Sequence, residues 1–493
     1  MRKSAQSRAA PSESIGRIDL LSQSVNHMAP VASLVFLISG VAVFAGGALP
    51  LALVGGLVGC LLLVIPIAEM AKHLPSAAGF ATFVAHGMHP SLGFLVGWGY
   101  VLVESLIPPM FYLLLGNVAA NLFLEQLKWP YEPWWLASAV AAALVIPAIA
   151  YFGIRVNTRA GMFLAFFQLG IFVMLAVWLI ASAGRANTPA VFGTKYSTVE
   201  GFPGFTGTFA GAVLVLLAFI GFESSVPLAE DASNPRRLVR VSLLPSVIVG
   251  GVFYILLTYA AVVAYGSRQF AGFAQAGSGH PWELLAGTIW GKGRFIIYLA
   301  LVSSALGAAN AGLSAAARTW YALGRLHLFP AVFGRTHVRW HSPYVAVLAQ
   351  LPVGLGVVLW LGKEYNPVAA IGLLFSMVAP VMLAIFMAVN LSCVCYFWRV
   401  RRNEFDPIRH GVIPVAGVLV CIPTLFTVLG FGGSILSFIR PLPHPLSLAR
   451  PALGAWFVLG VLYLTYLSVK HPDRLDGIRR VFPDEGSLGQ PRR

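Results

Sequence analysis

The sequence predicts an all-α polytopic membrane protein whose twelve transmembrane helices form a single domain. Of its 493 residues, 58% are hydrophobic and 10% are charged, whereas soluble domains carry roughly 25% charged residues. Its mean hydropathy is +0.79. The apolar stretches run for about 20 residues or more, which is the length of a helix that crosses a bilayer and not that of a barrel strand.

Apolar runs, turn residues and charged loops divide the chain into these helices. The first run, from Met28 to Ala68, has no charged residue and no histidine, and it is too long for one crossing. A turn at Gly46-Gly47-Ala48-Leu49-Pro50 divides it. We expect helices at about residues 22–46, 50–71, 90–123, 134–153, 159–183, 207–231, 240–266, 295–324, 343–362, 366–398, 411–432 and 451–469.

The distribution of basic residues predicts the orientation in the membrane. An even number of crossings puts both termini on one side, and the tails and loops of that side hold 24 of the 33 Lys and Arg. Because basic loops stay in the cytoplasm, we expect cytoplasmic tails at 1–21 and 471–493 around a single transmembrane domain at 22–470, in the cell membrane. The net charge of +15 then reflects topology and contact with anionic lipid, not nucleic-acid binding.

The stretch from Gly201 to Arg237 is unsuited to a simple membrane anchor. Its apolar run is interrupted by Gly221, Glu223 and Pro227. Gly and Pro favour a break whose freed backbone groups need partners, and such a break is tolerated only inside protein or beside a cavity. A plain kinked helix is the alternative. The first helix is interrupted in a similar way at Met28-Ala29-Pro30, about 190 residues earlier, and paired interruptions point to a site between inverted repeats.

Two carboxylates fall near the middle of predicted helices. Glu104 and Glu223 are costly there, and each is expected to hold a substrate ammonium, carry a proton or pair with a buried polar group. His86 and His89 have a metal-compatible spacing but no third ligand, so we expect surface histidines in a loop and no metal site. The four cysteines lie in apolar runs and predict buried side chains without disulfides or zinc.

Several motifs, in this order, resemble the amino acid/polyamine/organocation (APC) permease superfamily. They are Ala68-Glu69 followed by the segment 74–80, then the segment 93–98, and then 219–223 followed by 228–231 and 234–237. The resemblance implies a LeuT-like fold with two inverted five-helix repeats, at about 22–183 and 207–398, and two peripheral helices at about 411–469.

The same resemblance implies a solute held at the interrupted middles of the first and sixth helices. Backbone N–H groups after the first break suit a carboxylate, and carbonyls before the second break suit an ammonium. The substrate-binding residues expected on this basis are Met28, Ala29, Pro30, Val31, Ala32, Ser33, Glu104, Phe219, Ile220, Gly221, Phe222 and Glu223.

The coupling ion is less closely specified by the sequence. A helix-5 lysine of some proton-coupled relatives falls on Gln168, and glutamine cannot carry that proton. The candidates for coupling are therefore Glu104, the Gln168 position and Glu223, with H+ expected and sodium or exchange left open. The segment around Glu104 resembles putrescine-importer-like members, which favours cationic amines.

We therefore expect a secondary active transporter of amino acids or related amines that works by alternating access. A polyamine or cationic amine importer, or a solute exchanger, is the alternative within the superfamily. A membrane enzyme is disfavoured because no HExxH, Gly-x-Ser-x-Gly or Walker-type motif is present, and no cofactor is expected. A channel is disfavoured because no filter-like repeat is visible. A non-transporting sensor is the remaining alternative.

Overall fold

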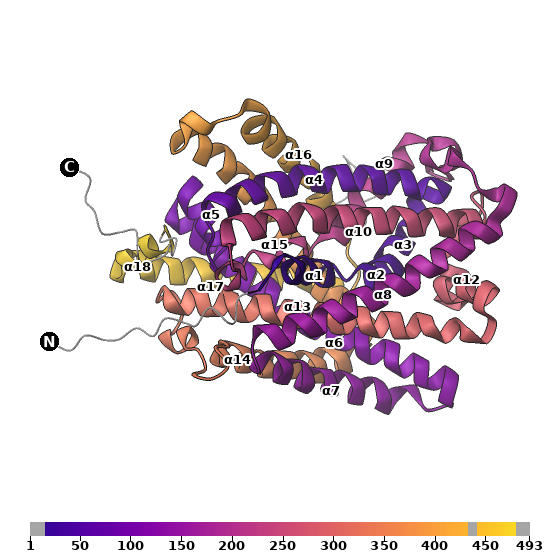
Figure 1. The fold of residues 1–493 in the computed structure, drawn as a ribbon, viewed down its shortest axis with the longest axis horizontal. Coiled ribbons are helices and arrows are strands. Elements are labelled where there is room, and N and C mark those ends of the chain that lie inside the picture. Colours follow the sequence, from indigo (N-terminus) through magenta and orange to yellow (C-terminus); the bar gives the residue numbers. More distant parts are fainter. Residues whose placement is uncertain (1–14, 432–440, 480–493) are drawn as a thin grey trace.

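The protein is a bundle of long helices that run side by side along its longest axis (Figure 1). A computed structural model describes residues 15–431 and 441–479. Ten helical segments in these ranges are long and apolar enough to cross a membrane: Arg17–His73, Pro90–Leu127, Tyr131–Tyr151, Thr158–Ala186, Phe205–Ser225, Val239–Tyr265, Pro281–Arg325, Tyr344–Arg399, Pro407–Val428 and Leu446–Lys470. The prediction of an all-α polytopic membrane protein is confirmed.

Two of these segments are longer than 50 residues, which is enough for two crossings each. Arg17–His73 has 57 residues and Tyr344–Arg399 has 56, whereas one crossing needs about 20. The first turns at Gly46, where φ is 53°, and the second is interrupted at Asn366, where φ is 62°. The count of twelve helices, the inverted repeats and the domain boundaries stay predictions.

The individual elements follow the chain in order. The α-helices are α1 (Arg17–His27), α2 (Pro30–Ala32), α3 (Ser39–Ala45), α4 (Leu49–His73), α5 (Phe80–Gly87), α6 (Pro90–Leu127), α7 (Tyr131–Tyr151), α8 (Ile154–Ala183), α9 (Phe205–Val215), α10 (Pro235–Tyr265), α11 (Ala276–Gly279), α12 (Pro281–Trp290), α13 (Ile296–Arg325), α14 (Tyr344–Gly356), α15 (Gly362–Arg399), α16 (Ile413–Val428), α17 (Ala449–Lys470) and α18 (Pro472–Asp476). Strands β1 (Thr198–Val199) and β2 (Phe202–Pro203) form a short antiparallel hairpin.

Several boundaries differ from those expected from the sequence. Helix α1 begins at Arg17, five residues early, because the Gly16 N–H donates to Asp19 Oδ2 at 2.8 Å and satisfies the helix start. The α-helical part of the sixth predicted helix ends at Val215 and continues only as short turns. The short helices α5 and α12 were not expected. His86 lies within α5 and not in a loop, whereas His89 is exposed and caps α6.

The helices differ strongly in burial, which places the centre of the molecule. The most apolar 18-residue stretch of Pro90–Leu127 is 100% buried, whereas that of Leu446–Lys470 is 17% buried. Helix α6 is therefore at the core and α17 at the periphery. Three cysteines, Cys60, Cys393 and Cys421, are buried as expected, and Cys395 is partly buried.

The two described ends of the chain lie on the same side of the bundle. The N–H of Ile15 donates to the Asp231 carbonyl at 2.9 Å, and Arg479 Nε donates to the Ala85 carbonyl at 3.0 Å. The loop with Asp231 reaches the loop before α5, since the Ala77 N–H donates to Glu230 Oε1 at 3.2 Å. Hydrogen bonds thus connect both described chain ends to the loops and helix ends on this side of the bundle.

Candidate functional site

The first helix is broken just after His27. Ala29 adopts a left-handed conformation, with φ 47° and ψ 58°, and Pro30 follows at the first position of α2. Proline has no N–H to donate and an L-residue rarely adopts positive φ, so the sequence fixes the break here. The Ser33 hydroxyl donates to the Met28 carbonyl at 2.8 Å, which satisfies one of the freed carbonyls.

The second break follows α9 and falls on Gly221, where φ is 114°. The chain is extended at Ile220, with ψ 130°, before a short turn at Phe222–Ser225. The Gly221 N–H donates to Glu223 Oε2 at 3.0 Å, and the Tyr254 hydroxyl donates to the Ala218 carbonyl at 2.9 Å. Both sides of the break therefore have side-chain partners.

The two breaks touch each other. A Cβ on Gly221 would lie 2.6 Å from the His27 carbonyl carbon and 2.7 Å from the Met28 nitrogen. Only glycine permits both this close approach and the positive φ. The Ser224 hydroxyl also donates to the Gln23 carbonyl at 3.3 Å. The interruptions that the sequence places about 190 residues apart thus form one structural unit.

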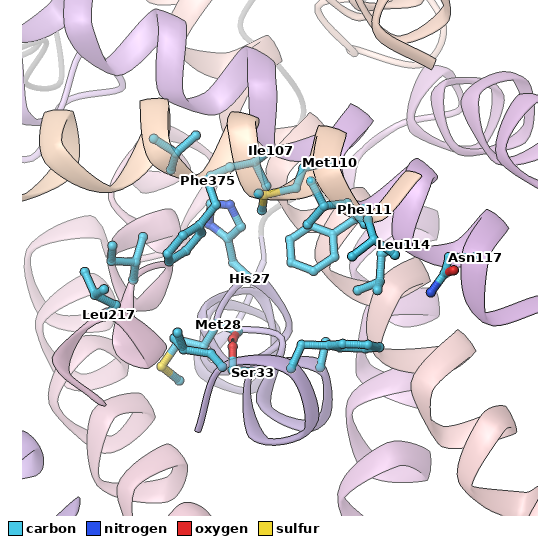
Figure 2. A pocket seen from close by; sticks show the side chains of 18 residues that line it. His27, Met28, Ser33, Ile107, Met110, Phe111, Leu114, Asn117, Leu217 and Phe375 are labelled. Carbon is cyan, nitrogen blue, oxygen red and sulfur yellow. Dashed lines mark hydrogen bonds between the residues drawn. The ribbon is translucent and has the colours of Figure 1, made fainter. Parts of the chain in front are cut away.

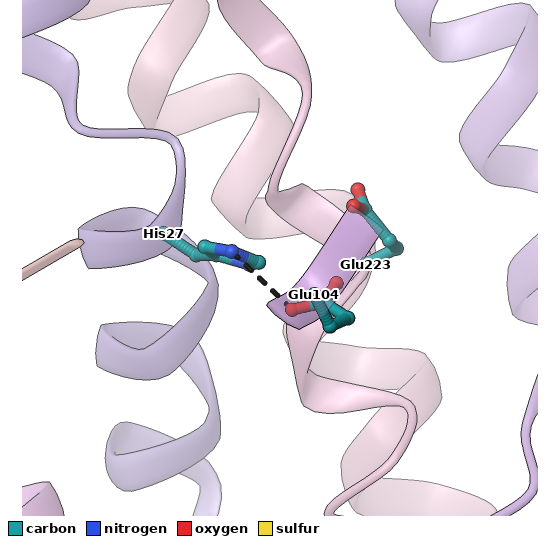
Figure 3. A group of neighbouring side chains, drawn as sticks. All are labelled: His27, Glu104 and Glu223. Carbon is teal, nitrogen blue, oxygen red and sulfur yellow. Dashed lines mark ion pairs between the residues drawn. The ribbon is translucent and has the colours of Figure 1, made fainter. Parts of the chain in front are cut away.

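A buried trio of titratable side chains lies at this contact: His27, Glu104 and Glu223 (Figure 3). One ligating atom of each lies within 4.8 Å of those of the other two, and His27 Nε2 is 3.6 Å from Glu104 Oε2. Their exposures are 3%, 0% and 0%. Helices α1 and α6 and the break after α9 each contribute one member.

Most polar atoms of the trio have no hydrogen-bond partner among the described residues. These are both ring nitrogens of His27, both oxygens of Glu104, and Glu223 Oε1. Buried polar groups without partners are costly, and charged ones more so. An imidazole and two carboxylates at this spacing can share protons, receive an ammonium group or hold another cation. The expectation that the protein has no metal site stays a prediction.

An apolar cavity of about 310 Å³ opens beside the trio (Figure 2). Its walls come mainly from the broken first helix, α6 and α15, with residues such as Phe36, Phe111 and Phe375. The polar side chains in its lining are His27, Ser33 and Asn117. His27 is the one member of the trio that lines the cavity, and a ligating atom of each carboxylate lies within 4.8 Å of one of its ring nitrogens.

The expected substrate-binding residues fall into two groups. Met28, Ala32, Ser33 and Ile220 line the cavity, whereas the other eight do not: Ala29, Pro30, Val31, Glu104, Phe219, Gly221, Phe222 and Glu223. The aromatic pair flanking the second break is packed in the core. Phe219 meets Tyr254 edge-on at 5.4 Å between ring centroids, and Phe222 stacks on Phe386 at 5.2 Å.

Sequence reasoning missed His27 and the whole α6 wall. His27 directly precedes the Met-Ala-Pro break, and this position was a usable signal. The α6 residues Ile107, Phe111 and Leu114 follow Glu104 at helical spacing, so they lie on its face of the helix. That spacing would also have found them. The contribution of Phe375 depends on how α15 packs, and no local pattern indicates it.

Gln168 lies apart from the trio and joins helices through neutral amides. It is fully buried, and its Nε2 donates to Asn26 Oδ1 at 3.2 Å. Asn26 in turn donates from Nδ2 to the Gly161 carbonyl at 2.6 Å. A Cβ on Gly307 would lie 2.4 Å from Asn26 Oδ1, so α13 leaves room for this amide. Gln168 therefore connects α8 to α1 one residue before His27.

Two interrupted helices that meet at buried acids beside an apolar cavity are typical of membrane transporters. The chain belongs to the amino acid permease family, whose profile matches residues 15–458. The resemblance to APC-superfamily permeases is thereby confirmed.

Similar proteins of known activity include transporters of both amines and amino acids. The low-affinity putrescine importer PlaP of Escherichia coli (strain K12) is 26% identical over 433 residues, which is 85% of each chain. The branched-chain amino acid permease BcaP of Bacillus subtilis (strain 168) is 26% identical over 464 residues, or 89% of each chain. The histidine permease HisP of Lactococcus lactis is 25% identical over 306 residues, 57% of this chain and 59% of HisP.

Proposed function

We propose that this chain is a secondary active transporter that moves amino acids or amines across the cell membrane by alternating access, with its termini in the cytoplasm. One observation carries the proposal: the two helix breaks meet at a cavity with a buried polar trio at its base. Membership of a permease family supports it. The presence of amine and amino acid transporters among the relatives supports the substrate class.

The cavity favours a substrate with one polar end and an apolar body. The polar end belongs at the base, where His27 can donate to a carboxylate and the two acids beneath can attract an ammonium. The Ala32 N–H, expected to hold a carboxylate, donates instead to Ser304 Oγ at 3.2 Å. The apolar body then lies against Phe111 and Leu114. A zwitterionic amino acid with an apolar side chain fits this arrangement.

A polyamine or cationic amine is the second candidate. Two carboxylates, Glu104 and Glu223, face one imidazole, and this excess of acids favours a cation. A diamine, however, would carry its second ammonium among apolar walls, where a charge without a partner is costly. Asn117 is the polar side chain available there, and its Oδ1 already accepts from the Tyr131 hydroxyl at 2.8 Å.

Protons are the proposed coupling ions, and Glu104 and Glu223 are the proposed carriers with His27 as the route to the cavity. Other titratable groups near the trio are Tyr100, one turn before Glu104 on α6, and Cys60 on α4. Gln168 is excluded as a carrier because an amide does not take up a proton at neutral pH, and its Nε2 is engaged with Asn26.

The cavity and the ion pairs on the opposite half indicate which side is closed. Phe36 and Leu37 follow the first break, so the cavity lies in the half away from the chain ends. In the other half, Arg318 pairs with Asp231 at 2.9 Å. With the termini in the cytoplasm, this arrangement is an outward-facing state.

Binding to purified protein tests the substrate class. Leucine, isoamylamine, which is leucine without its carboxylate, and putrescine are compared by thermal shift, since a ligand of the folded state raises the unfolding temperature. We expect leucine to stabilise most and putrescine least. Glu104→Gln should abolish the shift, and Glu200→Gln, at an exposed acid outside the cavity, should keep it. Stabilisation by putrescine alone would replace the amino acid proposal with the amine one.

A further inference from the structure

A second cavity, of about 590 Å³, lies at the ends of three helices on the side of the described chain termini. The end of α4, the start of α10 and the segment after α15 surround it. Its lining is strongly basic and includes Lys72, His73, Arg236, Arg237, Arg240 and Arg401. It is separate from the solute cavity and shares no residue with it.

The positive charges of this basic cavity outnumber the carboxylates near them. Glu69 forms ion pairs with two of the basic residues: its Oε1 lies 3.0 Å from Arg240 Nη2, and its Oε2 lies 4.0 Å from Lys72 Nζ. Glu404 pairs with Arg401 and lies 3.1 Å from His73 Nε2. A hydrogen bond from Arg401 lowers the pKa of Glu404, so this carboxylate is ionised at neutral pH. Five Lys and Arg against two acids leave three positive charges in excess, without counting His73.

The positive charge that no carboxylate neutralises comes from Arg236, Arg237 and the N-terminus of α10. Arg236 and Arg237 are exposed, and neither has a carboxylate partner within the described residues. They lie in the first turn of α10, a helix of 31 residues that is capped by Asn234. The first N–H groups of a helix and its dipole attract anions. Since Pro235 has no N–H and the Arg237 N–H donates to Asn234 Oδ1, the start of α10 contributes mainly its dipole, which adds to the positive charge of the cavity.

Beyond the basic cavity, apolar side chains of α10 become exposed at Ile248, Val249 and Val252. Helices α4 and α10 pack together, since a Cβ on Gly251 would lie 2.5 Å from Leu57. Val58 on α4 and Val252 on α10 are 53% and 58% exposed. Val252 is about 18 Å along the helix from Arg240 at about 1.5 Å per residue. That distance matches one leaflet of a hydrocarbon core about 30 Å thick.

We propose that the basic cavity binds the phosphate of an anionic phospholipid headgroup, whose acyl chains lie along the exposed faces of α4 and α10. A soluble anion would not need the apolar strip, whereas a lipid uses both features. Basic pockets between helices at the cytoplasmic surface are suited to such headgroups. The lipid joins α4, α10 and the segment after α15, so its binding stabilises their relative positions. This site depends on the membrane placement of the chain and not on the identity of the solute.

Purified protein titrated with phosphatidylglycerol in detergent tests the proposal, with bound lipid counted by native mass spectrometry and stability followed by thermal unfolding. The double variant Arg236→Gln/Arg237→Gln should bind phosphatidylglycerol about thirtyfold more weakly, because each basic residue contributes a few-fold. The control Arg335→Gln/Arg339→Gln removes the same charge from another loop and should bind as wild type does. Lys72→Gln gives a milder second test in case the double variant is poorly folded.

The same titration with phosphatidylcholine and with inorganic phosphate identifies the ligand. Phosphatidylcholine should bind weakly to all variants, and inorganic phosphate should not reproduce the stabilisation. Equal loss in the cavity variant and the control would show general charge attraction and overturn the site. Full stabilisation by inorganic phosphate would overturn the lipid in favour of a soluble anion.

Discussion

Replacing Gly221 with alanine perturbs the contact on which the solute site depends. The new Cβ would meet the His27 carbonyl carbon at 2.6 Å and the Met28 nitrogen at 2.7 Å, both of them backbone atoms that cannot rotate away. The backbone at Gly221 also has a φ of 114°, which L-residues avoid. Gly266 is a matched control, since its φ is 115° and a Cβ added there would have no neighbouring atom within 4 Å.

The two substitutions separate conformational strain from the steric clash. Both substitutions destabilise the folded protein by about 1–3 kcal/mol, because an L-residue is forced into an unfavourable backbone conformation. Gly221→Ala incurs in addition about 1–3 kcal/mol for inserting a methyl group into packed surroundings. If the two breaks separate to relieve the clash, the binding free energy of the solute becomes less favourable by the energy of the clash. This corresponds to an affinity about 5- to 150-fold weaker.

Thermal unfolding and ligand binding on both purified variants measure this difference. We expect Gly266→Ala to lose stability but keep the wild-type affinity for its best ligand. Gly221→Ala should unfold at a lower temperature than Gly266→Ala and lose affinity by the factor above. Equal unfolding temperatures and equal affinities for the two variants would refute the idea that the contact between the breaks builds the site.

Three further substitutions test other parts of the site. Glu223→Gln should reduce proton-driven uptake at least tenfold with little change in unfolding temperature, and a wild-type uptake rate would remove Glu223 from coupling. Leu114→Trp should fill the cavity and weaken binding of leucine more than that of alanine, as measured by competition; equal weakening would indicate a general disturbance. Gln168→Ala should destabilise the protein by about 1–3 kcal/mol, because Asn26 Oδ1 loses a buried donor. Its pH profile of uptake should stay that of wild type, and a shifted profile would implicate the amide in coupling.

The sequence indicated the breaks because their causes are local. Pro30 and Gly221 interrupt helices through missing N–H groups and tolerated positive φ, and both effects are visible in a string of residues. Glu104 and Glu223 stood out because charges are rare in apolar runs. The nature of the local residues therefore predicted where the chain departs from regular helix.

The arrangement between distant segments was beyond sequence reasoning. The place of His27 before the first break is visible in the sequence, but its burial and its 3.6 Å distance to Glu104 arise only when α1 packs against α6. The cavity is likewise set by packing, which brings Phe375 from α15 opposite α6. For the same reason, which of the twelve expected residues line the cavity could not be read from the sequence, and four of them do: Met28, Ala32, Ser33 and Ile220.

The most direct test of the central claim is solute counterflow with purified protein in proteoliposomes. Vesicles loaded with unlabelled leucine should accumulate external radiolabelled leucine without any ion gradient, and an imposed proton gradient should then drive uptake into empty vesicles. Glu104→Gln should abolish both, and Glu200→Gln should abolish neither. Absence of counterflow for leucine, isoamylamine and putrescine alike, in protein that remains folded, would contradict the assignment of the cavity as a transport site for amino acids or amines.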